Sequence, residues 1–155
     1  MPTIGDWKRV HADLMEKLRL PCKLRFSSET KVIGRHILED GGKLDGVRIV
    51  NCCIEVNPEA DFRVPEHLIL HEAAHHRNMA AINDDDFDVC DGPGKRGCCF
   101  APNGHCKHWA KALCDMYQET GTPLPQTTSF VEFANMAGIA RKNFTREGDP
   151  ADKDA

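Results

Sequence analysis

The chain has 155 residues, of which 41% are hydrophobic and 28% charged, and its formal net charge is −4. This length suits one domain with a hydrophobic core, and the composition is that of a soluble globular protein. No run approaches the ~18 consecutive apolar residues of a membrane span, and the charged N-terminus argues against a signal peptide. Lysine and arginine are scattered along the sequence, so no basic patch indicates nucleic-acid binding. We therefore expect an intracellular, cytoplasmic protein without a membrane partner.

The first predicted element is an amphipathic helix. Apolar residues recur at intervals of three or four positions from Trp7 to Leu18, which is the period of one helix face. Thr3 with Asp6 suits the start of this helix, and Pro21 suits its end.

Three extended segments are predicted next. Residues 22–26 alternate between apolar and basic side chains, residues 31–38 form a second extended stretch, and residues 47–57 give the strongest strand signal. Turn chemistry between the last two comes from Gly41-Gly42 and from Asp45-Gly46.

The third extended segment has two distinct faces. One face of residues 47–57 is apolar and includes Cys52, and the other carries Cys53 among polar residues. We expect both cysteines to behave as small hydrophobic core residues.

Helices are predicted for most of the remaining chain. Pro65 opens a helix that runs to about Ala81, a second helix covers His105 to Glu119, and Ser129 begins a short third one. Residues 83–103 between the first two have no periodicity. The order of elements predicts an α+β fold with a small antiparallel or mixed sheet packed against helices. The predicted domain covers residues 1–144, and residues 145–155 form a charged, disordered tail.

The strongest chemical motif is His71-Glu72-Ala73-Ala74-His75, which matches H-E-x-x-H. Residues four apart share one face of a helix, so His71 and His75 can bind the same zinc ion. Glu72 lies about 100° around the helix, where it misses the metal but can reach a water molecule bound to it. This arrangement predicts a catalytic zinc site with Glu72 as general base.

Catalytic zinc commonly has three protein ligands. The metzincin position is occupied by Ala81, which excludes that subclass. His76 points to a different helix face and is expected at the surface or behind the ligands. His105 is the preferred third ligand, with His108 one turn on as a supporting or substrate-contacting residue and Glu119 as a weaker candidate.

His71 to His75, followed after an insert by Gly104-His105 and then His108-Trp109, resembles the SprT-like metallopeptidases, the family that includes Spartan. The segment from Ile54 to Pro58 is similar to the family's strand before the active-site helix. The resemblance implies a zincin-like fold, His105 as third zinc ligand, Trp109 as its accompanying aromatic residue, and protein substrates that include DNA-associated proteins. The sequence departs from the family pattern at His108, where an acidic residue is common, and in having no four-cysteine zinc ribbon after Cys114.

The insert is rich in cysteine and admits two interpretations. Cys90, Cys98, Cys99 and Cys106 are candidates for a second, structural metal site. Their spacing differs from a paired Cys-x-x-Cys knuckle, which favours free thiols or a single disulfide.

We therefore expect a zinc metallopeptidase with a protein or peptide substrate. Two alternatives remain open: a non-catalytic zinc module that binds a partner, and a zinc hydrolase acting on a non-peptide amide.

Overall fold

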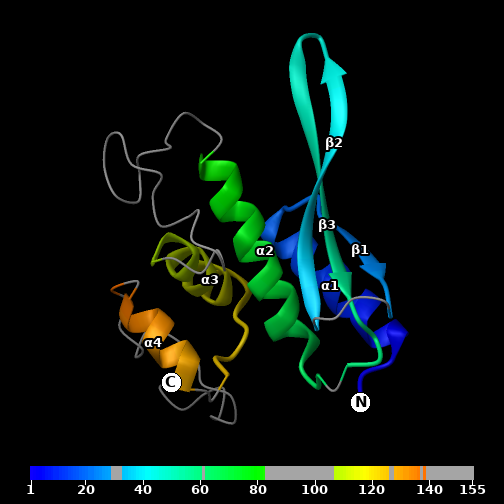
Figure 1. Cartoon of the computed structure of the whole chain (residues 1–155). Coiled ribbons are helices and arrows are strands. Elements are labelled where there is room, and N and C mark those ends of the chain that lie inside the picture. Colours follow the sequence, from blue (N-terminus) through cyan, green and yellow to red (C-terminus); the bar gives the residue numbers. More distant parts are fainter. Residues whose placement is uncertain (29–32, 61, 83–106, 126–127, 137, 139–155) are drawn as a thin grey trace. The chain divides into compact units, whose positions relative to one another are not determined.

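The computed structural model describes the chain except for residues 29–32, 61, 83–106, 126–127, 137 and 139–155. It confirms an α+β fold with a mixed three-stranded sheet packed against helices (Figure 1). The elements in chain order are α1 (Ile4–Leu18), β1 (Lys23–Phe26), β2 (Gly34–Leu44), β3 (Val47–Val56), α2 (Pro65–Ile82), α3 (Lys107–Thr120) and α4 (Thr128–Met136). No described helix has the length and apolar character needed to cross a membrane.

The chain divides into two compact units, Met1–His76 and Arg77–Ala155. The first unit contains α1, the sheet and the larger part of α2. The second contains α3 and α4. The predicted tail at 145–155 lies outside the described residues.

Helix α1 begins and ends as its sequence predicts. The Thr3 hydroxyl accepts a hydrogen bond from the Asp6 backbone N–H, and the Asp6 carboxylate accepts one from the Thr3 N–H, which completes a capping box. Trp7 is buried and its ring lies 6.4 Å from that of Phe62. From the middle of the helix, His11 bonds the Cys22 carbonyl oxygen at 2.8 Å, which anchors the segment that leads into β1.

The sheet has the strand order β1-β3-β2. β1 runs parallel to β3, with Lys23 opposite Cys53, and β2 runs antiparallel to β3, with His36 opposite Ile54. β3 is therefore the central strand, and residues 52–56 are all buried. β3 offers no edge to an extended peptide, because both of its edges are already paired.

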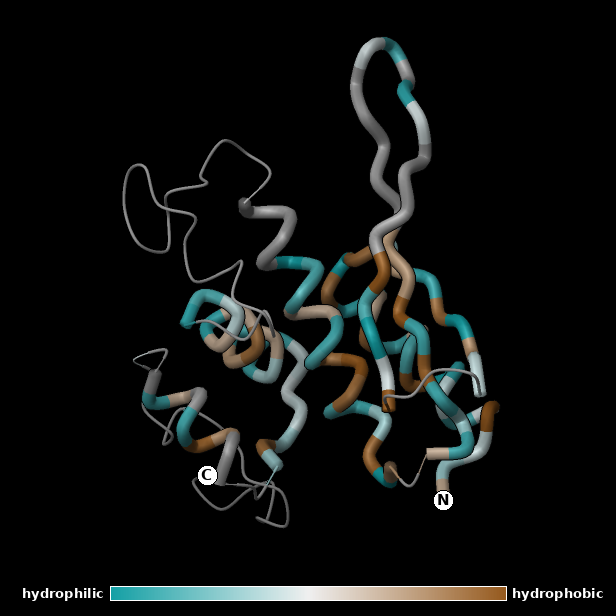
Figure 2. Tube along the Cα trace, in the orientation of Figure 1, coloured by the Kyte–Doolittle hydropathy of each residue, from teal (hydrophilic) through white to brown (hydrophobic). Residues whose placement is uncertain are grey.

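β2 is longer than predicted because Gly41-Gly42 forms no chain reversal. The register shifts between Asp40 and Lys43, and Gly42 has a φ of +83°, so the two glycines lie in a β-bulge within the strand. The reversal falls at Asp45 and Gly46, whose φ angles of 53° and 81° suit a tight hairpin turn. The resulting hairpin extends beyond β1, and Figure 2 shows that its tip is hydrophilic.

In the second unit, α3 ends at Thr120, one residue beyond the predicted end, and Gly121 follows with a φ of +68°. Its Tyr117 ring packs edge-on against Phe130 of α4 with the ring centres 4.9 Å apart. α4 begins at Thr128, one residue before Ser129, the predicted cap.

Candidate metal centre

Helix α2 carries the H-E-x-x-H motif, as predicted. Pro65 opens the helix where its missing N–H is not needed, and Glu66 lies in the first turn. The His71 and His75 rings lie on one side of the helix with their centres 5.1 Å apart, and both are half-buried. Two imidazoles this close fit two ligands of one zinc ion, whose ligand nitrogens are about 3.3 Å apart in tetrahedral geometry.

Glu72 faces the sheet. Its side chain is buried, with only 5% of the residue exposed. Burial raises the pKa of the Glu72 carboxyl from 4.5 to about 7, and a hydrogen bond from the backbone of His36 in β2 opposes the rise. The motif's carboxylate therefore lies between α2 and the beginning of β2, in an environment where it exchanges protons near neutral pH.

The structure does not test the predicted third ligand. His105 and the four insert cysteines (Cys90, Cys98, Cys99 and Cys106) lie outside the described residues. His108 is half-buried on α3, and Trp109 is fully buried there. Glu119, the weaker candidate, forms a two-point ion pair with Arg77 at 2.8 and 3.0 Å, which gives its carboxylate a different role.

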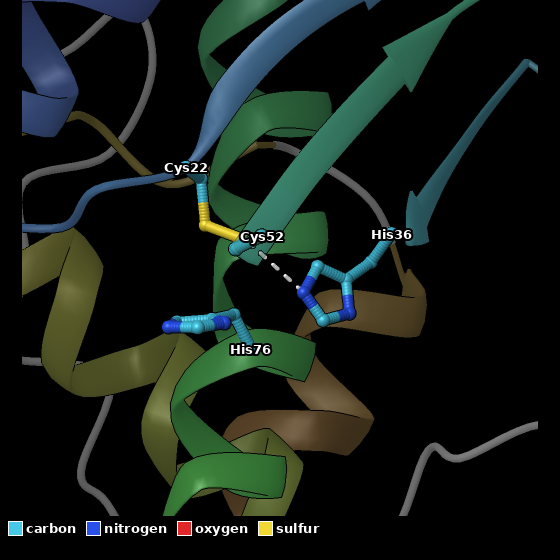
Figure 3. Close-up of side chains that lie close together, drawn as sticks. All are labelled: Cys22, His36, Cys52 and His76. Atoms are coloured by element: carbon cyan, nitrogen blue, oxygen red, sulfur yellow. Dashed lines mark hydrogen bonds between the residues drawn. A yellow bond between two sulfur atoms is a disulfide. The ribbon is translucent and has the colours of Figure 1, made fainter. Parts of the chain in front are cut away.

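A second cluster lies on the side of the sheet that meets α2. The donor atoms of Cys22, His36, Cys52 and His76 all lie within 4.8 Å of one another (Figure 3). Cys22 precedes β1 and Cys52 lies in β3, so the parallel pairing of these strands brings the two sulfur atoms together as a disulfide. Cys52 is buried in the core, as expected, but its disulfide with Cys22 was not expected. Cys53, on the opposite face of β3, is buried and outside any disulfide, as expected.

Burial disfavours the charged form of both histidines in this cluster. Burial, followed by the proximity of His76, lowers the pKa of His36 to about 4, and burial also lowers the pKa of His76. The His36 Nε2 atom lies 3.1 Å from the Cys52 sulfur, and the two imidazole ring centres are 5.4 Å apart. His76 is half-buried and contributes a donor atom to this cluster, a role that its position beside His75 did not indicate.

This cluster was missed in the sequence because its members are far apart along the chain. The Cys22–Cys52 pair is separated by 30 residues, and no local spacing links it to the two histidines. Only the parallel pairing of β1 with β3 and the packing of α2 assemble the set. Among the described residues it is the one group of Cys, His, Asp and Glu side chains that could bind a metal ion such as zinc.

Comparison of this chain with protein-family models, with curated proteins and with solved structures finds no match.

Proposed function

We propose that this protein is a zinc-dependent metallopeptidase in which His71, His75 and His105 hold the metal and Glu72 is the general base. The observation that carries the proposal is the arrangement on α2, where two imidazoles are 5.1 Å apart and a buried carboxyl group follows the first of them. The resemblance of the two histidine motifs to SprT-like metallopeptidases supports His105 as the third ligand.

Zinc supplies Lewis acidity, which lowers the pKa of water and polarises the scissile carbonyl. Glu72 accepts a proton from the attacking water molecule and later donates it to the departing amine. Burial of Glu72, which raises its pKa to about 7 in the metal-free chain, supports both roles, because a group that titrates near the working pH can accept and release the same proton.

The substrate chain needs a place to lie across the metal. Among the described strands, β2 pairs with β3 along one edge only, and its His36 backbone bonds Glu72. An extended peptide that adds to the other edge of β2 would pass beside the general base. We therefore assign substrate alignment to β2. DNA-associated proteins are candidate substrates on the basis of the family resemblance.

A non-catalytic zinc module is the second candidate function. The observation that favours it is the cluster of two cysteines and two histidines, because such a set closes the coordination shell of a structural zinc ion. This alternative predicts zinc binding without turnover. A zinc hydrolase of non-peptide amides predicts turnover of small amides and none of a peptide library.

The test is digestion of casein and of a DNA-binding protein by the purified chain, with and without single-stranded DNA. We expect cleavage that a chelator stops and added zinc restores. Glu72→Gln should retain zinc and lose activity by a factor of about 10² to 10⁴ or more. Glu59→Gln, which changes an exposed carboxylate, should remain active. Full proteolysis by Glu72→Gln would exclude this mechanism.

A further inference from the structure

The cluster at Cys22, His36, Cys52 and His76 joins every strand of the sheet to α2. Cys22 lies immediately before β1, His36 is in β2, Cys52 is in β3, and His76 is in α2. All four belong to the first compact unit, so their mutual placement does not depend on the second. A metal ion held by these four residues would connect four elements at one point.

The donor atoms nearly have the spacing that zinc requires. In a tetrahedral site, Zn–S and Zn–N bonds of about 2.3 and 2.0 Å place neighbouring donors about 3.3 to 3.8 Å apart. The His36 Nε2 to Cys52 Sγ distance is 3.1 Å, and no pair of donors in the cluster exceeds 4.8 Å. The two sulfurs, which are bonded to each other, must separate before both can bind one ion.

A second observation points independently to a ligand. The Nδ1 atom of His76 is buried and has no hydrogen-bond partner. A buried nitrogen without a hydrogen-bond partner costs about 1 to 3 kcal/mol, and a bound ion or ordered water is one of the ways in which native proteins satisfy such a group. The His76 ring lies in the same cluster as the two sulfur atoms, and imidazole nitrogen is a common zinc ligand.

We propose that Cys22, His36, Cys52 and His76 form a structural zinc site in the reduced protein, and that the Cys22–Cys52 disulfide is the metal-free, oxidised form of the same site. The two states exclude each other because a sulfur atom in a disulfide is no longer a thiolate ligand. This site is separate from the His71–His75 pair and does not depend on the proposed peptidase activity.

A dithiol can reduce the disulfide form of the site to the zinc-binding form. Two electrons and two protons pass from the dithiol to the Cys22–Cys52 bond, which gives two protein thiols and the cyclic disulfide of the reductant. Zinc then displaces the two thiol protons as it binds both sulfurs. In the reverse direction, a small-molecule disulfide accepts the two electrons, the Cys22–Cys52 bond re-forms and zinc is released.

The experiment titrates the full chain with Co²⁺ as a substitute for zinc. A background variant replaces the insert cysteines with serine, because their thiols would otherwise contribute to the same signal; these are Cys90, Cys98, Cys99 and Cys106. The dithiol-reduced background protein should show a near-ultraviolet sulfur-to-cobalt charge-transfer band, and the oxidised background protein should show none. Comparing two redox states of one protein requires no further variant to fold.

Single variants then assign the ligands. Cys52→Ser and His76→Ala should each lower zinc content by one ion per chain in the reduced state, whereas Cys53→Ala, which removes a neighbouring thiol on the opposite face, should not. His75→Ala should leave the thiolate band unchanged, which separates this site from the proposed catalytic one. Absence of the band in the reduced background protein would overturn the proposal, as would an unaltered band in both Cys52→Ser and His76→Ala.

Discussion

Replacing Glu72 with glutamine should stabilise the metal-free protein, because the buried carboxylate is costly to ionise. The pKa of Glu72 rises from 4.5 to about 7 in the folded state. At about 1.4 kcal/mol per pKa unit, this difference destabilises the native state by about 3 kcal/mol once the carboxyl is ionised. Glutamine has almost the same shape and keeps an oxygen that can accept the His36 backbone hydrogen bond.

The stability that Glu72→Gln gains over wild type should increase with pH. A carboxyl whose pKa is raised by folding binds more protons in the native state, so native stability falls as pH rises from 4.5 to about 7 and then levels off. The glutamine side chain does not titrate. Its advantage is therefore absent near pH 4 and complete near pH 8, where we expect about 1 to 3 kcal/mol after subtracting the cost of burying an unpaired amide N–H.

Urea denaturation in the presence of a chelator measures this difference. The wild-type chain, Glu72→Gln and the exposed-site control Glu59→Gln should be compared near pH 4 and near pH 8, all in the same redox state. The midpoint for Glu72→Gln should exceed that of wild type at the higher pH only. An equal or lower midpoint near pH 8 would refute the burial argument, and an advantage of the same size at both pH values would refute its electrostatic cause.

Three further substitutions test the sheet and its surroundings. Glu55→Gln should cost about 1 to 2 kcal/mol at neutral pH, because the buried Glu55 carboxylate bonds two half-exposed arginines, Arg35 among them at 2.7 Å. The hydrogen bond from Arg35 lowers the pKa of Glu55. The stability that Glu55 contributes is therefore present above the unfolded-state pKa and is lost as pH falls through the folded-state pKa. If urea denaturation showed Glu55→Gln to be less stable than wild type by the same amount in acid as at neutral pH, the ion-pair explanation would be contradicted. Gly34→Ala should destabilise by about 1 to 3 kcal/mol, since its Cβ would lie 2.9 Å from Leu68 Cδ2, and an unaltered melting temperature would show that this contact relaxes freely. Gly5→Ala in α1, where the nearest atom is 3.6 Å away, should instead raise the melting temperature slightly, and a lower value would contradict the open geometry there.

Local sequence patterns predicted most of the individual elements. The start of α1 at Thr3, the alternation in β1, and Pro65 at the start of α2 all depend on contacts within a few residues, and such contacts can be read from spacing alone. The same holds for His71 and His75, because a four-residue separation on a helix determines that they are neighbours.

Features that depend on non-local pairing were missed. Gly41-Gly42 suits a turn by composition, but the pairing with β3 continues past it and makes it a bulge. The central position of β3 follows from the parallel pairing with β1, which no short motif indicates. The Cys22–Cys52 pair depends on that same pairing, so a cysteine that fits an apolar strand face was expected to be a core residue.

The coordination of zinc in the oxidised background protein tests the peptidase proposal most directly, because the Cys22–Cys52 disulfide removes both sulfurs of the second cluster and the serine replacements remove those of the insert. X-ray absorption at the zinc edge should show one ion per chain, bound by three imidazoles and one further light-atom ligand, with no sulfur at about 2.3 Å. If the His75→Ala variant no longer binds this zinc ion, the ion belongs to the site on α2. A zinc ion with sulfur ligands, or with four protein ligands and no position for water, would contradict the account.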